Sequence, residues 1–73
     1  MTPRAHTLRV ESSVIRSVTY GADATLTVHL HRGAVYRYFT VPRTVVEQLL
    51  AAPSKGAYFT RHIRDGFPYQ RVS

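Results

Sequence analysis

An alternating stretch, a glycine turn and a second β-rich stretch constrain the fold of this chain more than any other feature. Residues 25–31 read TLTVHLH, in which apolar and polar side chains alternate. This period of two is typical of a strand with one buried face. The turn HRG follows, and residues 34–41 read AVYRYFTV, which is rich in β-branched and aromatic residues. The pattern predicts an antiparallel β-hairpin.

The length of the turn decides which face of the second strand is buried. A three-residue loop places Gly33 in the left-handed conformation and puts Tyr36 and Tyr38 on the apolar face. A two-residue loop would put Arg37 there instead, and an unpaired buried charge is costly. We therefore expect the three-residue loop. Its cross-strand pairs would be Leu30 with Ala34, Val28 with Tyr36, and Leu26 with Tyr38.

A further strand is predicted before the hairpin, over residues 13–20, SVIRSVTY. Ile15 breaks the parity that Val14 and Val18 share. Either Ile15 faces the other side of the sheet or a β-bulge shifts the phase of the strand. The tetrapeptide GADA that follows is a turn signal.

Two helices are predicted after the hairpin. Pro42 ends the strand and suits the first turn of a helix. Residues 43–52, RTVVEQLLAA, place apolar side chains on one stripe at the helical period, and a second proline stops this helix. Ser54 is a favourable N-cap for another helix, which would run to about Arg64 with Gly66 as its stop.

These elements predict an α+β domain, because an apolar sheet face must be covered by another layer. The architecture would be a three-stranded antiparallel meander followed by two helices packed on one sheet face, a two-layer β-β-β-α-α arrangement. Residues 13–73 would form this single domain, and residues 1–12 a loosely ordered N-terminal segment. A chain of 73 residues has a thin core. A shallow surface, or a cleft shared between copies in a homo-oligomer, is therefore expected in place of a deep pocket.

Net charge narrows the classes of partner. Ten Lys and Arg residues against four Asp and Glu residues give a net charge of +6, which favours nucleic acid, nucleotides or an acidic surface. The charges are spread along the chain, so ordinary solvated charges remain the alternative. No apolar run reaches the roughly 18 residues of a membrane span, and the polar start is not typical of a signal peptide. No membrane partner is expected.

Catalysis, cofactors and metals are not predicted. The chain lacks cysteine, which excludes disulfides and thiolate zinc sites and fits a cytoplasmic location. It shows no nucleophile elbow, paired acids or phosphate-cradling glycine loop. His29 and His31 could reach one metal ion from a strand, but no third ligand has a fixed spacing. We expect a protein that is not an enzyme and that holds no cofactor.

The second predicted helix carries a candidate phosphate site. Its first turn, with Ser54, Lys55 and Gly56, offers free N–H groups and the positive end of the helix dipole to an anion. Lys55 opposes that dipole, so it is either placed for a ligand or simply solvated at a small cost. A helical wheel predicts these positions for the other side chains: Phe59 and Ile63 in the core, Tyr58 and His62 beside it, Arg61 and Arg64 in solvent.

The sheet offers two candidate stacking surfaces. Tyr36 and Tyr38 are either core residues with hydroxyls at the edge or platforms for bases. The uncovered face would be basic with one aromatic ring, similar in kind to the sheet surface of some RNA-binding modules. A plain exposed face or a dimer contact is the alternative. The uncovered face would carry His29, His31, Arg37 and Phe39.

Three segments, VESSVIRSVTY, VYRYFTVP and APSKGAYFTRHIRDGFPY, together resemble the KTSC domain, which is named after the C-terminus of some lysyl-tRNA synthetases. The resemblance covers about residues 10–70. Its hallmark is Y-x-Y followed by V-P and then S-x-G-x-Y-F. These positions are Tyr36, Tyr38, Val41, Pro42, Ser54, Gly56, Tyr58 and Phe59. Where the family commonly has Asn this chain has Thr60, which puts in doubt any role that needs an amide there.

The resemblance implies a domain without assigned catalytic residues. The family occurs as a short stand-alone bacterial or phage protein and as a synthetase appendage, and this context suggests RNA binding. The leading hypothesis is therefore a module that binds phosphate-bearing ligands, RNA or single-stranded nucleic acid first. The alternatives are a phage-type protein that sequesters a small nucleotide at the start of the second helix, and a protein-interaction module. The candidate contacts are Arg37, Ser54, Lys55, Gly56, Tyr58, Arg61, His62 and Arg64, with stacking by Tyr36, Tyr38 or Phe39.

Overall fold

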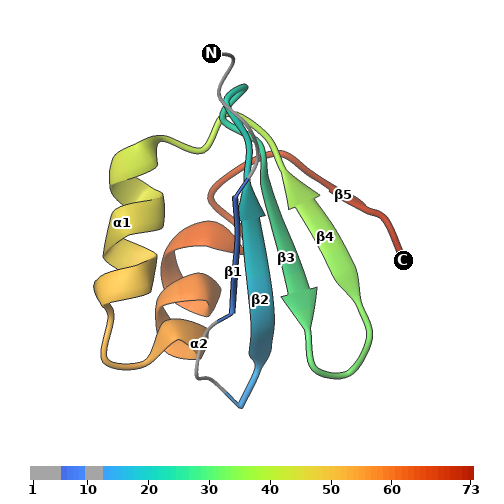
Figure 1. The fold of residues 1–73 in the computed structure, drawn as a ribbon, viewed down its shortest axis with the longest axis vertical. Coiled ribbons are helices and arrows are strands. Elements are labelled where there is room, and N and C mark those ends of the chain that lie inside the picture. The colour runs from blue at the N-terminus through green and yellow to red at the C-terminus, as the bar shows by residue number, and fades with distance from the viewer. Residues whose placement is uncertain (1–5, 10–12) are drawn as a thin grey trace.

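The computed structural model describes the backbone of residues 6–9 and all of residues 13–73, which form a sheet covered on one face by helices (Figure 1). The sheet is antiparallel, with five strands in the order β1-β2-β3-β4-β5. In chain order the elements are β1 (His6–Arg9), β2 (Ile15–Tyr20), β3 (Leu26–Leu30), β4 (Val35–Tyr38), α1 (Arg43–Ala51), α2 (Lys55–Tyr58), the π-helix η1 (Phe59–Ile63) and β5 (Tyr69–Arg71).

The predicted α+β meander with two helical segments on one face is confirmed, but the sheet has one more strand at each edge than predicted. β1 pairs with β2, and β5 returns after the helices to pair with β4, where Tyr69 lies opposite Tyr38. β1 falls within the segment expected to be loosely ordered; residues 1–5 and 10–12 of that segment lie outside the described residues. Both edge strands have four residues or fewer, too short to show a periodic pattern.

The hairpin has the three-residue loop that the sequence predicts. Gly33 has φ 97°, and its N–H donates to the Leu30 carbonyl at 3.0 Å. The predicted pairs Val28–Tyr36 and Leu26–Tyr38 are both present. This register fixes the faces of β4, because side chains alternate along a strand: the two tyrosines share one face and Arg37 lies on the other.

A β-bulge resolves the broken parity of β2. The register shifts between Ile15 and Ser17, and Ile15 is completely buried together with Val18. The bulge therefore brings Ile15 onto the core face, as one of the two predicted alternatives requires.

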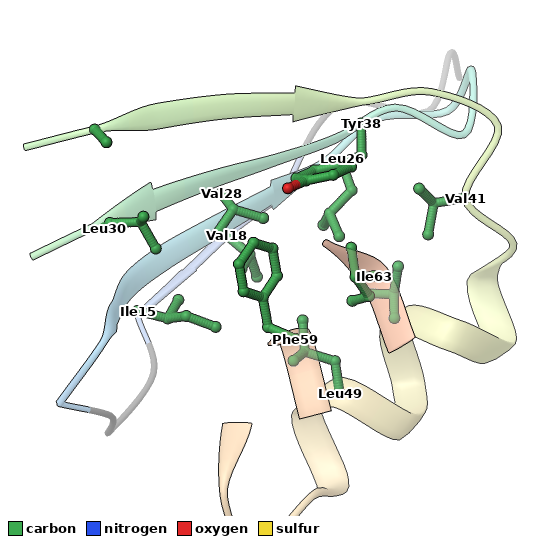
Figure 2. Packing of buried hydrophobic residues seen from close by; sticks show 12 residues of the cluster. Ile15, Val18, Leu26, Val28, Leu30, Tyr38, Val41, Leu49, Phe59 and Ile63 are labelled. Atoms are coloured by element: carbon green, nitrogen blue, oxygen red, sulfur yellow. The ribbon is translucent and has the colours of Figure 1, made fainter. Parts of the chain in front are cut away.

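The core lies between the sheet and the helices. Figure 2 shows Leu49, Phe59 and Ile63 pointing from the helices toward the sheet. All three are buried, and Tyr38 on β4 is only 2% exposed. The Tyr20 hydroxyl donates to the Val41 carbonyl at 2.7 Å and so ties the end of β2 to the connection that leads into α1.

The second helical segment departs from the continuous α-helix expected from the sequence. It begins at Lys55 as an α-helix and widens at Phe59 into a π-helix, in which the Arg64 N–H donates to the Phe59 carbonyl five residues earlier at 2.8 Å. Phe59 and Ile63 nevertheless enter the core, and Arg61 and Arg64 are exposed, as predicted. π-Turns are rare and often lie at functional sites. Among the described residues, no helix has the length and apolar character needed to cross a membrane.

Candidate functional site

The widened helix, the β3–β4 turn and β5 enclose a cleft of about 520 Å³. Its aromatic lining comes from Tyr36 and Tyr38 on β4, Tyr69 on β5 and Phe59 on η1. We call it the aromatic cleft. Its polar lining includes His31 and the charged residues Arg32, Arg64 and Asp65. Strand pairing and the start of the π-helix therefore bring rings and cations from distant parts of the chain to one place.

The four rings pack against one another in edge-to-face and tilted pairs. The ring of Tyr38 lies 5.7 Å from that of Phe59 at 82° and 5.4 Å from that of Tyr69. Tyr36 meets Tyr69 at 5.8 Å and 71°. Such tilted pairs add to the stability gained from burial. Cover by the helices ends at β4, since Tyr38 is buried while Tyr69 is 55% exposed, and the outer tyrosines therefore present ring surface to a ligand.

The polar groups of the aromatic cleft converge on the Tyr38 hydroxyl. The pKa of Tyr38 is raised to about 12, chiefly by burial and to a smaller extent by the nearby Tyr69, Tyr36 and Asp65, while the Arg64 guanidinium opposes the shift. The hydroxyl of Tyr38 is therefore protonated at neutral pH and can donate a hydrogen bond.

A second cleft, of about 530 Å³, lies at the start of α2. It is lined by Ser54, Lys55, Gly56 and Arg61 among others. We call it the helix-start cleft. Ser13, Val14 and Thr60 line both clefts, so the two clefts adjoin along this shared rim.

Two side chains of the helix-start cleft already have partners within the protein. Ser54 is the N-cap that the sequence predicts, and its hydroxyl oxygen accepts from the Ala57 N–H at 3.3 Å. The Lys55 ammonium donates to the Ala52 carbonyl at 3.1 Å. This bond is a structural reason for a lysine at the unfavourable end of a helix.

Tyr58 is half-buried against the core, as predicted, whereas His62 is exposed, and neither residue lines a cleft. The Tyr58 hydroxyl donates to Gln48 Oε1 on α1 at 2.7 Å, and its ring stacks on His62 with 4.5 Å between the ring centres. The hydrogen bond ties the Tyr58 side chain to α1, and His62 packs on the ring of Tyr58.

Of the residues predicted on the uncovered face of the sheet, one lines a cleft and others do not. Arg37 is exposed and Phe39 is half-buried, and neither lines a cleft. Arg37 cannot share a ligand with Tyr36 and Tyr38, because it points to the opposite face of the sheet. His31 follows the end of β3 and lines the aromatic cleft instead.

Three charged or aromatic residues of the aromatic cleft are not among the predicted contacts, and neither are the rim residues Ser13, Val14 and Thr60. Arg32 lies in the turn whose geometry was predicted but whose side chains were not placed. Asp65 directly follows the end of the second helix, and the pairing of β5 with β4 brings Tyr69 back to the cleft. Among the described residues, no three His, Cys, Asp or Glu side chains are close enough to hold a metal ion.

Comparison with known proteins identifies the family. The model of the KTSC domain matches residues 11–67. The chain belongs to the KTSC domain family. A crystal structure of a KTSC domain protein from Yersinia pestis superposes with a TM-score of 0.86 at 27% identity, covering 94% of this chain and 99% of that one.

Curated relatives place the same domain in larger proteins. A lysine–tRNA ligase of Trichormus variabilis is 45% identical over 67 residues, and one of a Nostoc species is 43% identical. The match spans 90% of this chain but only 12% of the length of either ligase. An uncharacterized protein of Stutzerimonas stutzeri is 42% identical over 53 residues, which cover 71% of this chain and 75% of that protein. The KTSC domain thus occurs both within ligases and in a short protein.

Proposed function

We propose that this KTSC domain is a non-enzymatic module that binds single-stranded RNA along the two joined clefts. The observation that carries the proposal is the shared rim of Ser13, Val14 and Thr60, which makes one track of an aromatic cleft and a cationic one. A polymer in which each unit carries a flat aromatic base and an anionic phosphate fits such a track.

The aromatic cleft suits one base and its phosphate. A base stacked on the exposed ring of Tyr69 or on Tyr36 would gain about 1–3 kcal/mol. Arg64 and Arg32 line the same cleft. A guanidinium group can donate two parallel hydrogen bonds to two oxygens of one phosphate. Base and phosphate contacts therefore fall within one nucleotide of each other.

The helix-start cleft suits the next phosphate of the chain. Arg61 is exposed and lines this cleft. Thr60 lies between the clefts, where its hydroxyl can bond the ribose 2′-OH that distinguishes RNA from DNA. A mononucleotide would fill only one of the two clefts, so the track favours an oligonucleotide.

Charge and relatives agree with this assignment. The net charge of +6 attracts a polyanion from a distance. The ligases that contain a region similar to this chain act, by their names, on tRNA, and an RNA contact is a natural use for a small domain of such an enzyme.

Fluorescence anisotropy with labelled oligoribonucleotides tests the proposal. Affinity should rise from a mononucleotide to a dinucleotide and to longer single strands, since the longer ligands occupy both clefts. With contacts from Arg32, Arg61 and Arg64, the logarithmic salt slope should be about −2, or roughly a 20-fold loss of affinity between about 50 and 200 mM salt.

Three results would contradict the proposal. Equal affinity for a mononucleotide and an oligonucleotide would favour the sequestration of a small nucleotide. A flat salt dependence would remove the phosphate contacts. No binding of any oligonucleotide would leave the protein-interaction module as the better hypothesis.

A further inference from the structure

Asp65 is an acidic residue in the aromatic cleft of a strongly basic protein. It is one of only four acidic residues in the chain and directly follows Arg64, just beyond the π-helix. Its side chain is exposed, and its charge acts on the Tyr38 hydroxyl inside the cleft. Within the described residues, no group donates a hydrogen bond to its carboxylate.

A carboxylate at this place repels phosphate, so any contact that it makes with the ligand involves another part of that ligand. An ionised carboxylate only accepts hydrogen bonds, and its two oxygens can accept from two neighbouring donors. Single-stranded RNA exposes the Watson–Crick edges of its bases to such groups. The question is which base offers two adjacent donors.

Guanine is the base whose Watson–Crick edge fits. Its N1–H and its 2-amino group lie side by side and both donate. Adenine and cytosine each present one amino group beside a ring nitrogen that accepts, and uracil presents one N–H between two carbonyls. A carboxylate can therefore form two charge-assisted hydrogen bonds with guanine, and such bonds are stronger than neutral ones.

We infer that the aromatic cleft selects guanine, with the Asp65 carboxylate accepting from N1–H and from the 2-amino group. The inference rests on the proposed RNA binding and names the base that the cleft takes. The Tyr38 hydroxyl, which is protonated at neutral pH, provides a donor for the adjacent guanine O6. The base stacks on the ring of Tyr69, and Arg32 or Arg64 binds the phosphate.

The test compares oligouridines that carry one central guanine, inosine, adenine, cytosine or uracil. The wild-type protein should bind the guanine ligand about 5- to 150-fold more tightly than the adenine, cytosine and uracil ligands, as expected for one bidentate pair. The inosine ligand, which lacks the 2-amino group, should have an intermediate affinity.

Asp65→Asn assigns the preference to the carboxylate. The amide keeps the size of the side chain but replaces one acceptor with a donor, so the preference for guanine should be lost while binding to oligouridine stays or rises slightly. Glu47→Gln is the matched control. Glu47 is exposed on α1 and lines neither cleft, so this variant has the same change of charge and should keep the preference.

The outcomes separate the two proposals. Salt-dependent binding without base preference in the wild type would overturn the guanine inference and leave RNA binding standing. A guanine preference that survives in Asp65→Asn would also overturn the role of the carboxylate. Failure of the wild type to bind any oligonucleotide would overturn RNA binding itself.

Discussion

The side chain of Lys55 reaches back and donates a hydrogen bond to the carbonyl oxygen of Ala52 at 3.1 Å. Ala52 is the C-cap of α1, so the first turn of one helix provides a partner for a carbonyl at the end of the preceding helix. Lysines near the ends of helices commonly bond such carbonyls. The basic residue that looked most like a ligand contact thus has a structural role, and Arg61 is the better phosphate contact of the helix-start cleft.

Lys55→Met separates these two roles. The change keeps the apolar stem and removes the hydrogen bond, so the free energy of unfolding should fall by about 0.5–1 kcal/mol, measured by urea denaturation. Affinity for RNA should fall less than in Arg61→Gln. A variant of unchanged stability whose RNA binding is as weak as that of Arg61→Gln would show that the ammonium contacts the ligand.

Four arginine variants locate the RNA track. Arg61→Gln and Arg64→Gln should each weaken binding and reduce the magnitude of the salt slope by about 0.7, because each removes one contact to a single strand. Arg37→Gln, on the other sheet face, and Arg43→Gln, on α1, remove the same charge outside both clefts. Anisotropy titrations at several salt concentrations should show little change for these two controls. Equal losses in all four variants would indicate a diffuse charge effect.

Tyr69 provides the most accessible ring of the aromatic cleft. Tyr69→Ala should weaken RNA binding by about 5- to 150-fold, the range expected for loss of one base–aromatic stack. Tyr69→Phe keeps the ring and should retain most of the affinity. Because Tyr69 is 55% exposed, the folded state should persist in both variants, which circular dichroism checks. Equal binding by Tyr69→Ala and the wild type would place the base elsewhere.

The sequence predicts the parts of the site that follow from the spacing of side chains along a strand or helix and from the cost of burying a charge. Alternation along β4 and the cost of burying Arg37 were enough to put Tyr36 and Tyr38 on the core face. The same logic placed Phe59 and Ile63 in the core, although the turn between them is a π-turn, because the two residues are one helical turn apart in either helix.

The rest of the site depends on contacts that no local pattern encodes. β5 has three exposed residues and is held by pairing with β4, by ring contacts of Tyr69, and by flanking backbone bonds such as that from the Phe39 N–H to the Pro68 carbonyl at 2.9 Å. Without that pairing, Tyr69 has no predicted relation to Tyr36. The partner of Lys55 likewise depends on the angle between α1 and α2, which the proline between them does not fix.

Gly66 limits how the chain can leave the π-helix. A Cβ added at this position would lie 2.8 Å from the backbone carbonyl oxygen of His62, which cannot rotate away as a side chain would. Gly66→Ala should therefore lower the free energy of unfolding by about 1–3 kcal/mol, measured by urea denaturation. Ala57→Gly, at an exposed position of α2, is a control for helix propensity and should cost at most about 1 kcal/mol. Unchanged stability of Gly66→Ala would mean that the backbone can shift to remove the close contact at no measurable cost.

Ionisation of Tyr38 should make the free energy of unfolding fall as the pH rises in the alkaline range. Burial raises its pKa in the folded protein from 10.0 to about 12, so between these values the folded state keeps a proton that the unfolded state has lost. Stability falls with pH wherever the folded state binds more protons. The contribution of Tyr38 is thus fully present below pH 10, is lost progressively toward pH 12, and changes no further above that.

Urea denaturation of the wild type and of Tyr38→Phe across this range isolates the effect. Phenylalanine cannot ionise, and every other ionisable side chain is the same in both proteins, so the difference in unfolding free energy between the two reports on Tyr38. The wild type should lose stability relative to Tyr38→Phe as the pH rises from about 10 to 12. A difference that stays constant with pH would show that the hydroxyl of Tyr38 ionises as easily in the folded protein as in the unfolded chain, and so is not shielded from water at the floor of the aromatic cleft.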